Sequence, residues 1–425
     1  MYHRRTEQGG EKSDQPSGAG HPNAGRQAGG ALRGSLPQGR GAPFGLYVHL
    51  PYCLHRCSYC DFNAHVRSDP PFDAMAAAIL ADLDGQIARF PAMAMRPCTS
   101  IFFGGGTPSL FPPDRIAFLI QGFAERLKLI PDLEITLETN PATREHGRFQ
   151  SYRDAGINRM SLGVQSFDEA DLRFLERLHD ADQAQRAIQE AVAIFPRVSL
   201  DLMYGLPGRD LAHWQEQLRQ GLATGVGHLS AYQLTVEPQT PMGRGHAAQP
   251  LALPDDDLSC DLTETTWALV DRAGLTPYEL ANFARPGQRC RHNLHVWRYG
   301  DYIGLGAGGH GKWGEEGKIW RRANPKSPEG YLADPHQGPW QRVLPEQGLE
   351  EALLSGLRTS EGVVRKRVQA RTGLSLPLIP ETLLGGGWLN ERGARIAASR
   401  EGWMMLDEVV VRWLVHAQEV RSRKG

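Results

Sequence analysis

Between residues 45 and 250, short apolar segments alternate with longer segments whose apolar positions recur every three or four residues. The short segments are typical of buried strands and the longer ones of amphipathic helices. Strands that alternate with helices form parallel sheets from repeated βαβ units, and six units are too few for a closed eight-stranded barrel. The pattern therefore predicts an α/β fold with an open, partial (β/α)6 barrel. Its six strands are expected at residues 45–50, 99–103, 133–139, 158–164, 197–204 and 228–234.

The pattern differs on either side of this region. Residues 1–42 are rich in Gly, Ser, Gln and Arg, and such a segment buries too little apolar surface to fold, so we expect a disordered tail. Beyond residue 250, an acidic start predicts a helix that ends at Gly274, and a strand is expected within residues 276–284. The predicted domains are the tail at 1–42, the barrel at 43–250, an α+β extension at 251–345 and a C-terminal helical, winged-helix-like domain at 346–425.

Composition and charge are those of an ordinary globular protein. Apolar residues make up 40% of the chain and charged residues 22%. The net charge of −1 gives no field that favours nucleic acid, and no apolar run is long enough to span a bilayer. The N-terminal segment lacks the apolar stretch of a secretory signal. We therefore expect a cytoplasmic protein that is not integral to a membrane and binds no nucleic acid.

Three of the six cysteines, Cys53, Cys57 and Cys60, lie within eight residues directly after the first predicted strand. Three thiolates on one short loop can hold three corners of a [4Fe–4S] cubane and leave the fourth iron open to another ligand. A zinc site is the alternative, completed by one of the nearby histidines, His49, His55 or His65. The spacing favours the iron–sulfur cluster, because zinc sites more often use two Cys-x2-Cys pairs.

Polar or glycine-rich residues stand at the ends of the other predicted strands. Three glycines at 104–106 follow the second strand, and Glu138, Gln165 and Asp201 lie at or near the ends of later strands. The carboxyl ends of parallel strands meet at one edge of a barrel, where barrel enzymes place their sites. Polar groups in buried strands are costly unless they meet partners, so this placement predicts a ligand pocket.

The Cys-x3-Cys-x2-Cys loop and the glycine loop together resemble the radical S-adenosylmethionine superfamily, over roughly residues 45–320. The resemblance implies that residues 43–250 are its core barrel and that S-adenosylmethionine chelates the open iron. It also implies that Arg177 pairs with the methionine carboxylate and Asp201 with ribose hydroxyls. Arg177 is chosen for this role only because its distance along the sequence from Gln165 matches the family motif. The full set of implied cosubstrate contacts is Tyr47, Tyr59, Gly105, Gly106, Thr107, Glu138, Gln165, Arg177 and Asp201.

Within that superfamily the chain is most similar to the coproporphyrinogen dehydrogenase-like family, which contains oxidases and heme chaperones. The oxidase branch has a further cysteine two residues beyond the third, where this chain has Phe62. The sequence His292-Asn293-Leu294-His295-Val296-Trp297 resembles the His-Asn-x-x-Tyr-Trp heme motif of the chaperone branch, with Val296 at the tyrosine position. The resemblance implies that His292 and Trp297 contact heme. His295 and Cys290 are rival axial ligands on the same segment.

These features predict a heme chaperone that binds heme and transfers it to acceptor proteins. Its cofactors would be one [4Fe–4S] cluster, S-adenosylmethionine and heme, and a low-potential electron donor would be a further partner. No catalytic residue is assigned, and coproporphyrinogen oxidase activity is not expected. The alternative function is an oxygen-independent coproporphyrinogen III oxidase of porphyrin biosynthesis, which acts through a 5′-deoxyadenosyl radical.

Overall fold

The computed structural model describes residues 41–142 and 147–422, so the predicted disordered tail lies almost wholly outside the described residues. All six predicted strands are present, and they are parallel neighbours in one sheet. The α/β prediction is confirmed. The strands are, in order, β1 (Phe44–Leu50), β4 (Pro97–Gly105), β5 (Lys128–Thr139), β6 (Arg159–Gln165), β7 (Arg197–Tyr204) and β8 (His228–Gln233).

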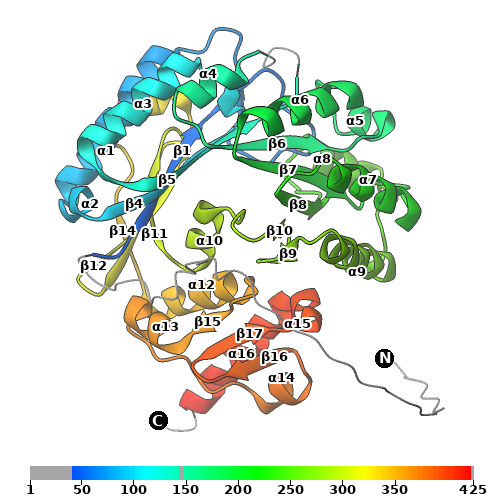
Figure 1. Cartoon of the computed structure of the whole chain (residues 1–425). Coiled ribbons are helices and arrows are strands. Elements are labelled where there is room, and N and C mark those ends of the chain that lie inside the picture. The colour runs from blue at the N-terminus through cyan, green and yellow to red at the C-terminus, as the bar shows by residue number, and fades with distance from the viewer. Residues whose placement is uncertain (1–40, 143–146, 423–425) are drawn as a thin grey trace, which may run out of the picture. The chain divides into compact units, whose positions relative to one another are not determined.

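Helices cover the outer face of this curved sheet, as Figure 1 shows. They include α1 (Phe72–Arg89), α3 (Pro113–Arg126), α4 (Phe149–Asp154), α6 (Ala181–Ile194), α7 (Leu211–Ala223) and α9 (Asp256–Arg272). Local sequence fixes their ends: Asp180 and Gln183 form a capping box at the start of α6. The helix predicted to end at Gly274 is α9, and Gly274 adopts a positive φ of +76° just beyond it.

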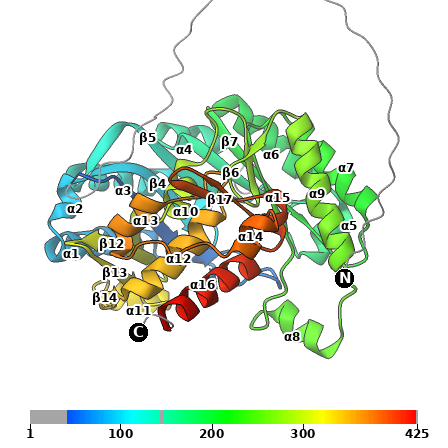
Figure 2. The same ribbon diagram turned by 90° about the horizontal axis from the view of Figure 1, so that it is seen from below.

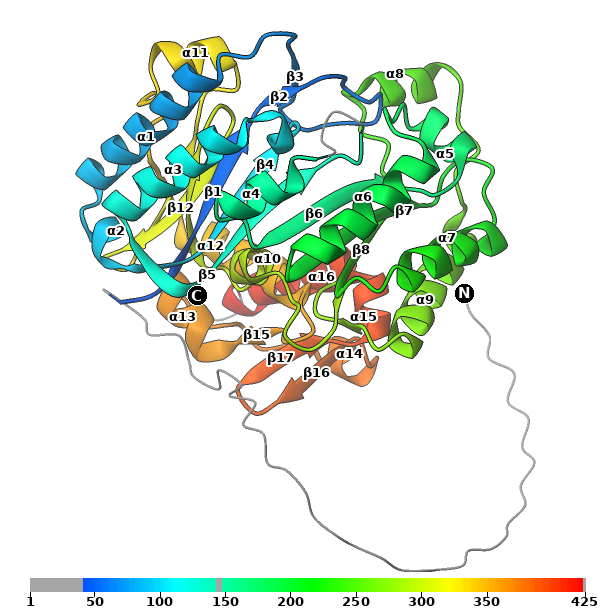
Figure 3. The ribbon, with the colours of Figure 1, turned by 45° about the horizontal axis from the view of Figure 1, so that its top comes forward.

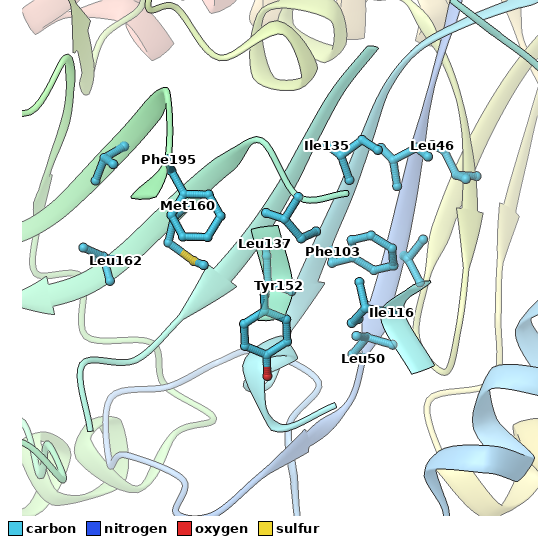
Figure 4. Close-up of a cluster of buried hydrophobic side chains, with 14 of the residues drawn as sticks. Leu46, Leu50, Phe103, Ile116, Ile135, Leu137, Tyr152, Met160, Leu162 and Phe195 are labelled. Carbon is cyan, nitrogen blue, oxygen red and sulfur yellow. The ribbon is translucent and has the colours of Figure 1, made fainter. Parts of the chain in front are cut away.

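The hydrophobic core lies between the sheet and these outer helices (Figure 4). Successive strand residues point to opposite faces, so alternate positions pack outward. Leu46, Phe103, Leu137 and Leu162 belong to this outer set and are fully buried. The residues between them face the barrel interior, and many are polar, namely Ser100, Thr136, Glu134, Arg159, Ser161 and Ser199.

The sheet continues beyond the six predicted strands, to twelve in the described part of the chain. On one side β11 (Asp301–Leu305) pairs in parallel with β1, followed by antiparallel β12 (His310–Glu315), β13 (Lys318–Ala323) and β14 (Gln341–Val343). On the other side lie β10 (Asn282–Ala284) and β9 (Thr276–Pro277), so the single strand expected at 276–284 is two short ones. The extension thus shares one sheet with the barrel, and the boundary at residue 250 stays a prediction.

One short helix lies on the inner side of the sheet. This is α10 (Arg291–Trp297), which Figure 1 shows within the curve of the barrel. It packs against β1 and β4 near their amino-terminal ends, where Gly45 leaves no side chain between the strand and His292. The segment that carries the predicted heme motif therefore closes the end of the barrel opposite the cysteine loop.

The C-terminal residues form their own hydrophobic cluster, which includes Leu353, Leu383, Val409 and Trp413. Figure 1 shows its elements below the sheet, and Figure 2, seen from below, shows its helices together in front. Its elements are α12 (Pro345–Leu357), β15 (Val363–Val364), α13 (Arg365–Thr372), α14 (Glu381–Gly385), β16 (Leu389–Arg392), β17 (Arg395–Ala398), α15 (Arg400–Met404) and α16 (Leu406–Ser422). The three strands form a separate antiparallel sheet. The description of this region as winged-helix-like stays a prediction.

Among the described residues, no helix combines the length and apolar character that a membrane crossing requires.

Candidate functional site

The three clustered cysteines lie on the loop between β2 (Tyr52–Cys53) and β3 (His65–Val66). The loop is braced from within by the Cys60 N–H, which donates to the Cys57 carbonyl at 3.1 Å. It is braced from outside by Met242, at the start of α8 (Pro241–Ala248), whose N–H donates to the Ser58 carbonyl at 2.9 Å. Figure 3 shows the loop running between β2 and α8. All three cysteines line one cavity of about 550 Å³ at the carboxyl ends of the strands.

The cysteine thiols lie in surroundings that suit a cationic ligand. Burial, together with the neighbouring Cys60 and Cys57, raises the pKa of Cys53 to about 11. Burial also raises the pKa of Cys60. Bound iron reverses this effect, because its positive charge deprotonates a coordinating thiol. The three cysteines therefore fit a cluster, with one thiolate on each of three irons.

The three histidines that could complete a zinc site are all engaged elsewhere. The Nε2 atom of His49 lies 3.0 Å from the Asn63 carbonyl, and that of His55 lies 3.3 Å from Glu176. His65 contacts Asn63 and the Lys326 carbonyl. Across residues 41–142 and 147–422, no group of three or more His, Cys, Asp or Glu side chains converges on the position of a single ion. A cubane does not require such convergence, because its ligands bind separate irons.

The glycine loop after β4 is needed for backbone packing as well as for access to the cavity. Gly105 has a φ of +125°, and a Cβ atom there would lie 2.8 Å from the Leu50 carbonyl oxygen. A Cβ atom on Gly106 would lie 2.7 Å from the Tyr52 carbonyl oxygen. Only glycine permits this approach. The loop thereby fixes the chain that leads into Cys53, and both glycines line the cavity together with Thr107.

Two half-buried carboxylic acids, Glu138 and Asp201, line the same cavity. Desolvation, together with the nearby Asp201, raises the pKa of Glu138 to about 8. Burial raises the pKa of Asp201 to about 6. The Gly105 N–H donates to Glu138 at 3.3 Å and the Ser161 hydroxyl to Asp201 at 3.2 Å. Two neighbouring carboxylic acids with raised pKa values favour a cationic ligand. Such a ligand would lower both pKa values.

Arg177, selected by its offset from Gln165, lies in the cavity wall next to the cysteine loop. Its guanidinium donates to the Gly163 carbonyl at 2.7 Å and to the Asn140 amide oxygen. It also lies 3.7 Å from the Cys57 sulfur and 3.5 Å from the Tyr59 hydroxyl. Its buried Nε finds no hydrogen-bond partner among the described residues. The arginine is thus held in place with one donor left for a ligand, and its predicted pairing with a carboxylate stays a prediction.

Gln165 lines the cavity at the end of β6 with a φ of +70°, a strained conformation for a residue that is not glycine. Strain of this kind is typical of functional sites. Several further polar residues line the cavity, among them Asn140 and Tyr232, which stand at predicted strand ends without an assigned role, and Ser161, which was not singled out from the sequence. The alternation along β6 could have identified Ser161, because it shares the inward face with Gly163 and Gln165.

Tyr47 is not among the residues that line the cavity. Its hydroxyl lies 2.9 Å from His49 Nδ1, and its ring lies 6.2 Å from the rings of both Phe102 and His292. A Cβ atom on Gly104 would touch both Tyr47 and Glu138, so the tyrosine lies beside the cavity wall. Its predicted contact with the cosubstrate stays a prediction.

The residues of the predicted heme motif lie at the other end of the barrel. His292 is 6% exposed, with its Nδ1 3.1 Å from the Ser100 hydroxyl and its ring stacked 5.0 Å from that of Phe102. Burial lowers the pKa of His292 to about 3. Trp297 lies under the Arg358 guanidinium, which is 4.8 Å from its ring. The structure therefore brings the cysteines and most of the cosubstrate residues together, and it places His292 and Trp297 apart from them.

The rival axial ligands are also buried. The Nε2 atom of His295 lies 2.7 Å from the Asp301 carbonyl, and burial lowers the pKa of this histidine to about 4. Cys290 is 2% exposed, and burial raises the pKa of its thiol to about 12. His292 likewise uses only one ring nitrogen, Nδ1, and its Nε2 makes no hydrogen bond to the described residues. An axial histidine usually binds iron through one ring nitrogen while the other is hydrogen-bonded, so this geometry suits both histidines and the choice of His292 stays a prediction.

Comparison with known proteins agrees with this site. The model of the Radical SAM superfamily matches residues 47–220, which places the chain in the class of radical S-adenosylmethionine proteins and implies a [4Fe–4S] cluster with S-adenosylmethionine. The heme chaperone HemW of Escherichia coli strain K12 is 38% identical over 374 residues, covering 87% of this chain and 97% of that protein. HemW of Haemophilus influenzae is 40% identical over 337 residues, covering 78% and 87%. The chain belongs to the HemW heme chaperone family.

A solved structure shares the fold. It is that of coproporphyrinogen III oxidase (HemN) from Escherichia coli, with a TM-score of 0.72 and 20% identity over 89% of this chain and 92% of that one. At this identity the likeness describes the fold alone.

Proposed function

We propose that the protein is a heme chaperone, which binds heme and passes it to acceptor proteins. The observation that carries the proposal is the similarity to HemW proteins, which extends over 97% of the Escherichia coli relative. A cytoplasmic location and a low-potential electron donor belong to the same proposal. When bound, the cluster supplies one electron to the sulfonium of S-adenosylmethionine. The residues of the cavity hold and orient that cosubstrate.

The charges in the cavity count against the alternative, an oxidase of coproporphyrinogen III. Four carboxylic acids line the cavity, and only two arginines, Arg56 and Arg177, offset them. Coproporphyrinogen carries four carboxylates of its own, and those acids of the cavity that are ionised repel them. A cationic ligand such as S-adenosylmethionine suits the same lining. Phe62 agrees with this, because it stands where the oxidase branch has a cysteine.

His292 is the axial ligand that we propose for heme. Before heme enters, its Nδ1 is held by Ser100, and Nε2 is the nitrogen that we propose for iron. Because the side chain is 6% exposed between α10 and the barrel strands, heme reaches it only when α10 moves away from β1 and β4, which also breaks the contact with Ser100. Heme binding is therefore coupled to displacement of a helix, and we expect it to be slow.

The test is a heme titration of the anaerobically reconstituted full-length protein, followed by the Soret absorbance. We expect a shifted Soret band in the wild type, and we expect His292→Ala to weaken binding or alter the spectrum. His295→Ala and Cys290→Ala are matched controls, because each removes a rival ligand from the same segment. The same protein, supplied with S-adenosylmethionine and reductant, should not convert coproporphyrinogen III. Protoporphyrinogen formation over several turnovers per chain would favour the oxidase instead, and absence of any heme-dependent change would remove the main support for the chaperone.

A further inference from the structure

The turn that follows α5 (Glu169–Phe174) contacts the cysteine loop from the side away from the cavity. One carboxylate oxygen of Glu176 accepts the Ser58 backbone N–H at 3.1 Å and lies 3.3 Å from the Nε2 atom of His55. The backbone carbonyl of Glu176 accepts the Cys57 thiol at 3.5 Å. This one glutamate therefore contacts three residues of the loop, through its side chain and through its backbone.

The backbone of Glu176 has a conformation that glycine adopts more easily than any other residue. Its φ is +52°, in the left-handed region, which costs free energy for a residue with a Cβ atom. Glycine would form the same turn without this cost. What the glutamate adds, and glycine would lack, is the pair of side-chain contacts to Ser58 and His55.

Two successive residues of this turn contact the same loop. The guanidinium of Arg177 lines the cavity and lies 3.7 Å from the Cys57 sulfur, whereas Glu176 is not among the residues that line the cavity. When iron binds, Cys57 loses its thiol proton and can no longer donate to the Glu176 carbonyl. The hydrogen bond from the Ser58 N–H to the Glu176 carboxylate does not depend on that proton, and it can persist in the loaded protein.

The turn itself is anchored to the fold. The Glu176 N–H donates to the Arg173 carbonyl at 3.1 Å, and the Arg177 N–H donates to the Leu172 carbonyl at 2.9 Å. Leu175, between them and α5, is fully buried. The hydrogen bond from Ser58 therefore ties the cysteine loop to a part of the molecule that is held in place by its own contacts.

We propose that Glu176 is a positioning residue for the iron–sulfur cluster, which acts through the Ser58 N–H on the segment between Cys57 and Cys60. Groups that hold the ligands of a metal site orient these ligands and tune the metal. The negative charge of the carboxylate also opposes reduction of the cluster, because reduction adds an electron to it. The Glu176 side chain is 46% exposed, so water screens this charge and its effect on the reduction potential is small. The proposal concerns the cluster that the family implies, and it does not depend on heme binding.

The test uses the anaerobically reconstituted full-length protein and separates the hydrogen bond from the charge. Glu176→Ala removes both, whereas Glu176→Gln retains an acceptor for the Ser58 N–H and loses only the charge. Iron loss to an excess of chelator should be about fivefold faster in Glu176→Ala, which is the effect of one partly exposed hydrogen bond. It should return to the wild-type rate in Glu176→Gln. The reduction potential, from a redox titration followed by electron paramagnetic resonance, should be more positive than that of the wild type in both variants.

Glu169→Ala is the matched control. Glu169 is an exposed glutamate at the start of the same helix, and it accepts a backbone N–H outside the cysteine loop, that of Ala181, at 2.8 Å. This variant should keep the wild-type rate of iron loss and the wild-type potential. All three variants should bind heme as the wild type does, so the heme titration tests the proposed function separately.

Three results would overturn the positioning role. The first is iron loss from Glu176→Ala at the wild-type rate. The second is iron loss that is equally fast in Glu176→Ala and Glu176→Gln, because the hydrogen bond would then not be what holds the loop. The third is a potential that is unchanged in both variants together with a melting temperature of Glu176→Ala apoprotein well below that of Glu169→Ala, because the glutamate would then only stabilise the fold.

Discussion

The two ends of the barrel handle buried polar groups in different ways. At the carboxyl ends of the strands, Glu138, Asp201 and the Nε of Arg177 line a cavity, and their hydrogen-bonding or charge requirements are only partly met. At the amino ends, Glu134 and Arg159 are both fully buried and paired at 3.1 Å. At the carboxyl ends, polar side chains therefore remain available to a ligand. At the amino ends, Glu134 and Arg159 pair with each other.

Glu134 and Arg159, at the amino ends of the strands, also hold α10 in place. The other oxygen of Glu134 accepts the backbone N–H of Arg291, the first residue of α10, at 2.6 Å. The side chain of Arg291 pairs with Asp132, and that of Arg159 donates to the carbonyls of Gln288 and Arg289 just before the helix. Ligands can therefore enter the cavity without rearrangement, whereas a ligand for His292 must compete with the contacts that hold α10 in place.

We call the carboxyl ends of the strands, which line the cavity, the open end of the barrel, and the amino ends, which α10 covers, the closed end. The largest effect that we expect comes from the open end. Replacing Cys53, Cys57 or Cys60 by Ala should abolish the iron–sulfur cluster, because each thiolate holds one corner of the cubane. Iron analysis and the broad visible absorption of anaerobically reconstituted protein measure this, and the wild type should hold about four irons per chain. Cys98→Ala and Cys260→Ala should retain full iron content, since neither residue lines the cavity. Stoichiometric zinc without visible absorption would show that the metal is misassigned.

At the closed end, Glu134→Gln should lower the free energy of unfolding by about 3–5 kcal/mol, because it leaves the Arg159 charge buried without a partner. Iron content should not change. Denaturant unfolding of the apoprotein measures the loss. Glu125→Gln is the control, because its contact with Arg126 is long and exposed, and such pairs contribute at most about 1 kcal/mol.

The same Glu134→Gln variant tests whether α10 restrains heme binding. Since Glu134 also holds the first N–H of α10, we expect faster heme association in this variant than in the wild type. Stopped-flow measurements would detect the change. An unchanged association rate in a destabilised protein would mean that the contacts that hold α10 do not slow heme binding.

Asp201→Ala and Glu138→Ala should weaken S-adenosylmethionine binding and leave the iron content unchanged. Each loses about 1.5–3 kcal/mol of charge-assisted hydrogen bonding, or about 10- to 150-fold in affinity. Calorimetry on the cluster-loaded protein measures it. Asp84→Ala is a control on the outer surface, where Asp84 pairs with Arg126. Unaltered affinity in both cavity variants would place the cosubstrate elsewhere.

A smaller effect is expected from pH. The pKa values of Glu138 and Asp201 are raised to about 8 and about 6, so both acids become protonated as the pH falls through these values. A cationic ligand binds the ionised form, and its affinity should therefore fall as the pH drops from above 8 to below 6. Glu138→Gln should flatten the upper part of this dependence. A wild-type affinity that stays constant across the range would contradict the raised pKa values.

The sequence predicts the open end better than the closed one. The period and length of the apolar segments predict the six strands. The positions of the cysteines and acids after these segments predict the cysteine loop and the acids at the strand ends. Arg177 has no such signal, because its segment has the pattern of a solvated helix, and only the family resemblance selects it. The placement of α10 inside the barrel depends on Gly45 and on contacts between residues far apart in the chain, such as His292 with Ser100.

The strands β11–β14 were missed for a different reason. They are short and mostly antiparallel, and glycine or charged residues interrupt them, so neither an apolar run nor a helical period marks them. Their pairing with β1 is a long-range contact that no local window contains.

The position of β1 in the sheet also has a consequence for synthesis of the chain. Its neighbours are β4, which follows soon after it, and β11, which ends at Leu305. Until β11 has emerged from the ribosome, one edge of β1 exposes unpaired backbone groups next to the loop that carries the cysteines. Unpaired edges of this kind recruit strands from other chains. The nascent chain is therefore most prone to aggregation before β11 emerges, and a truncation that stops short of residue 305 would make that state permanent.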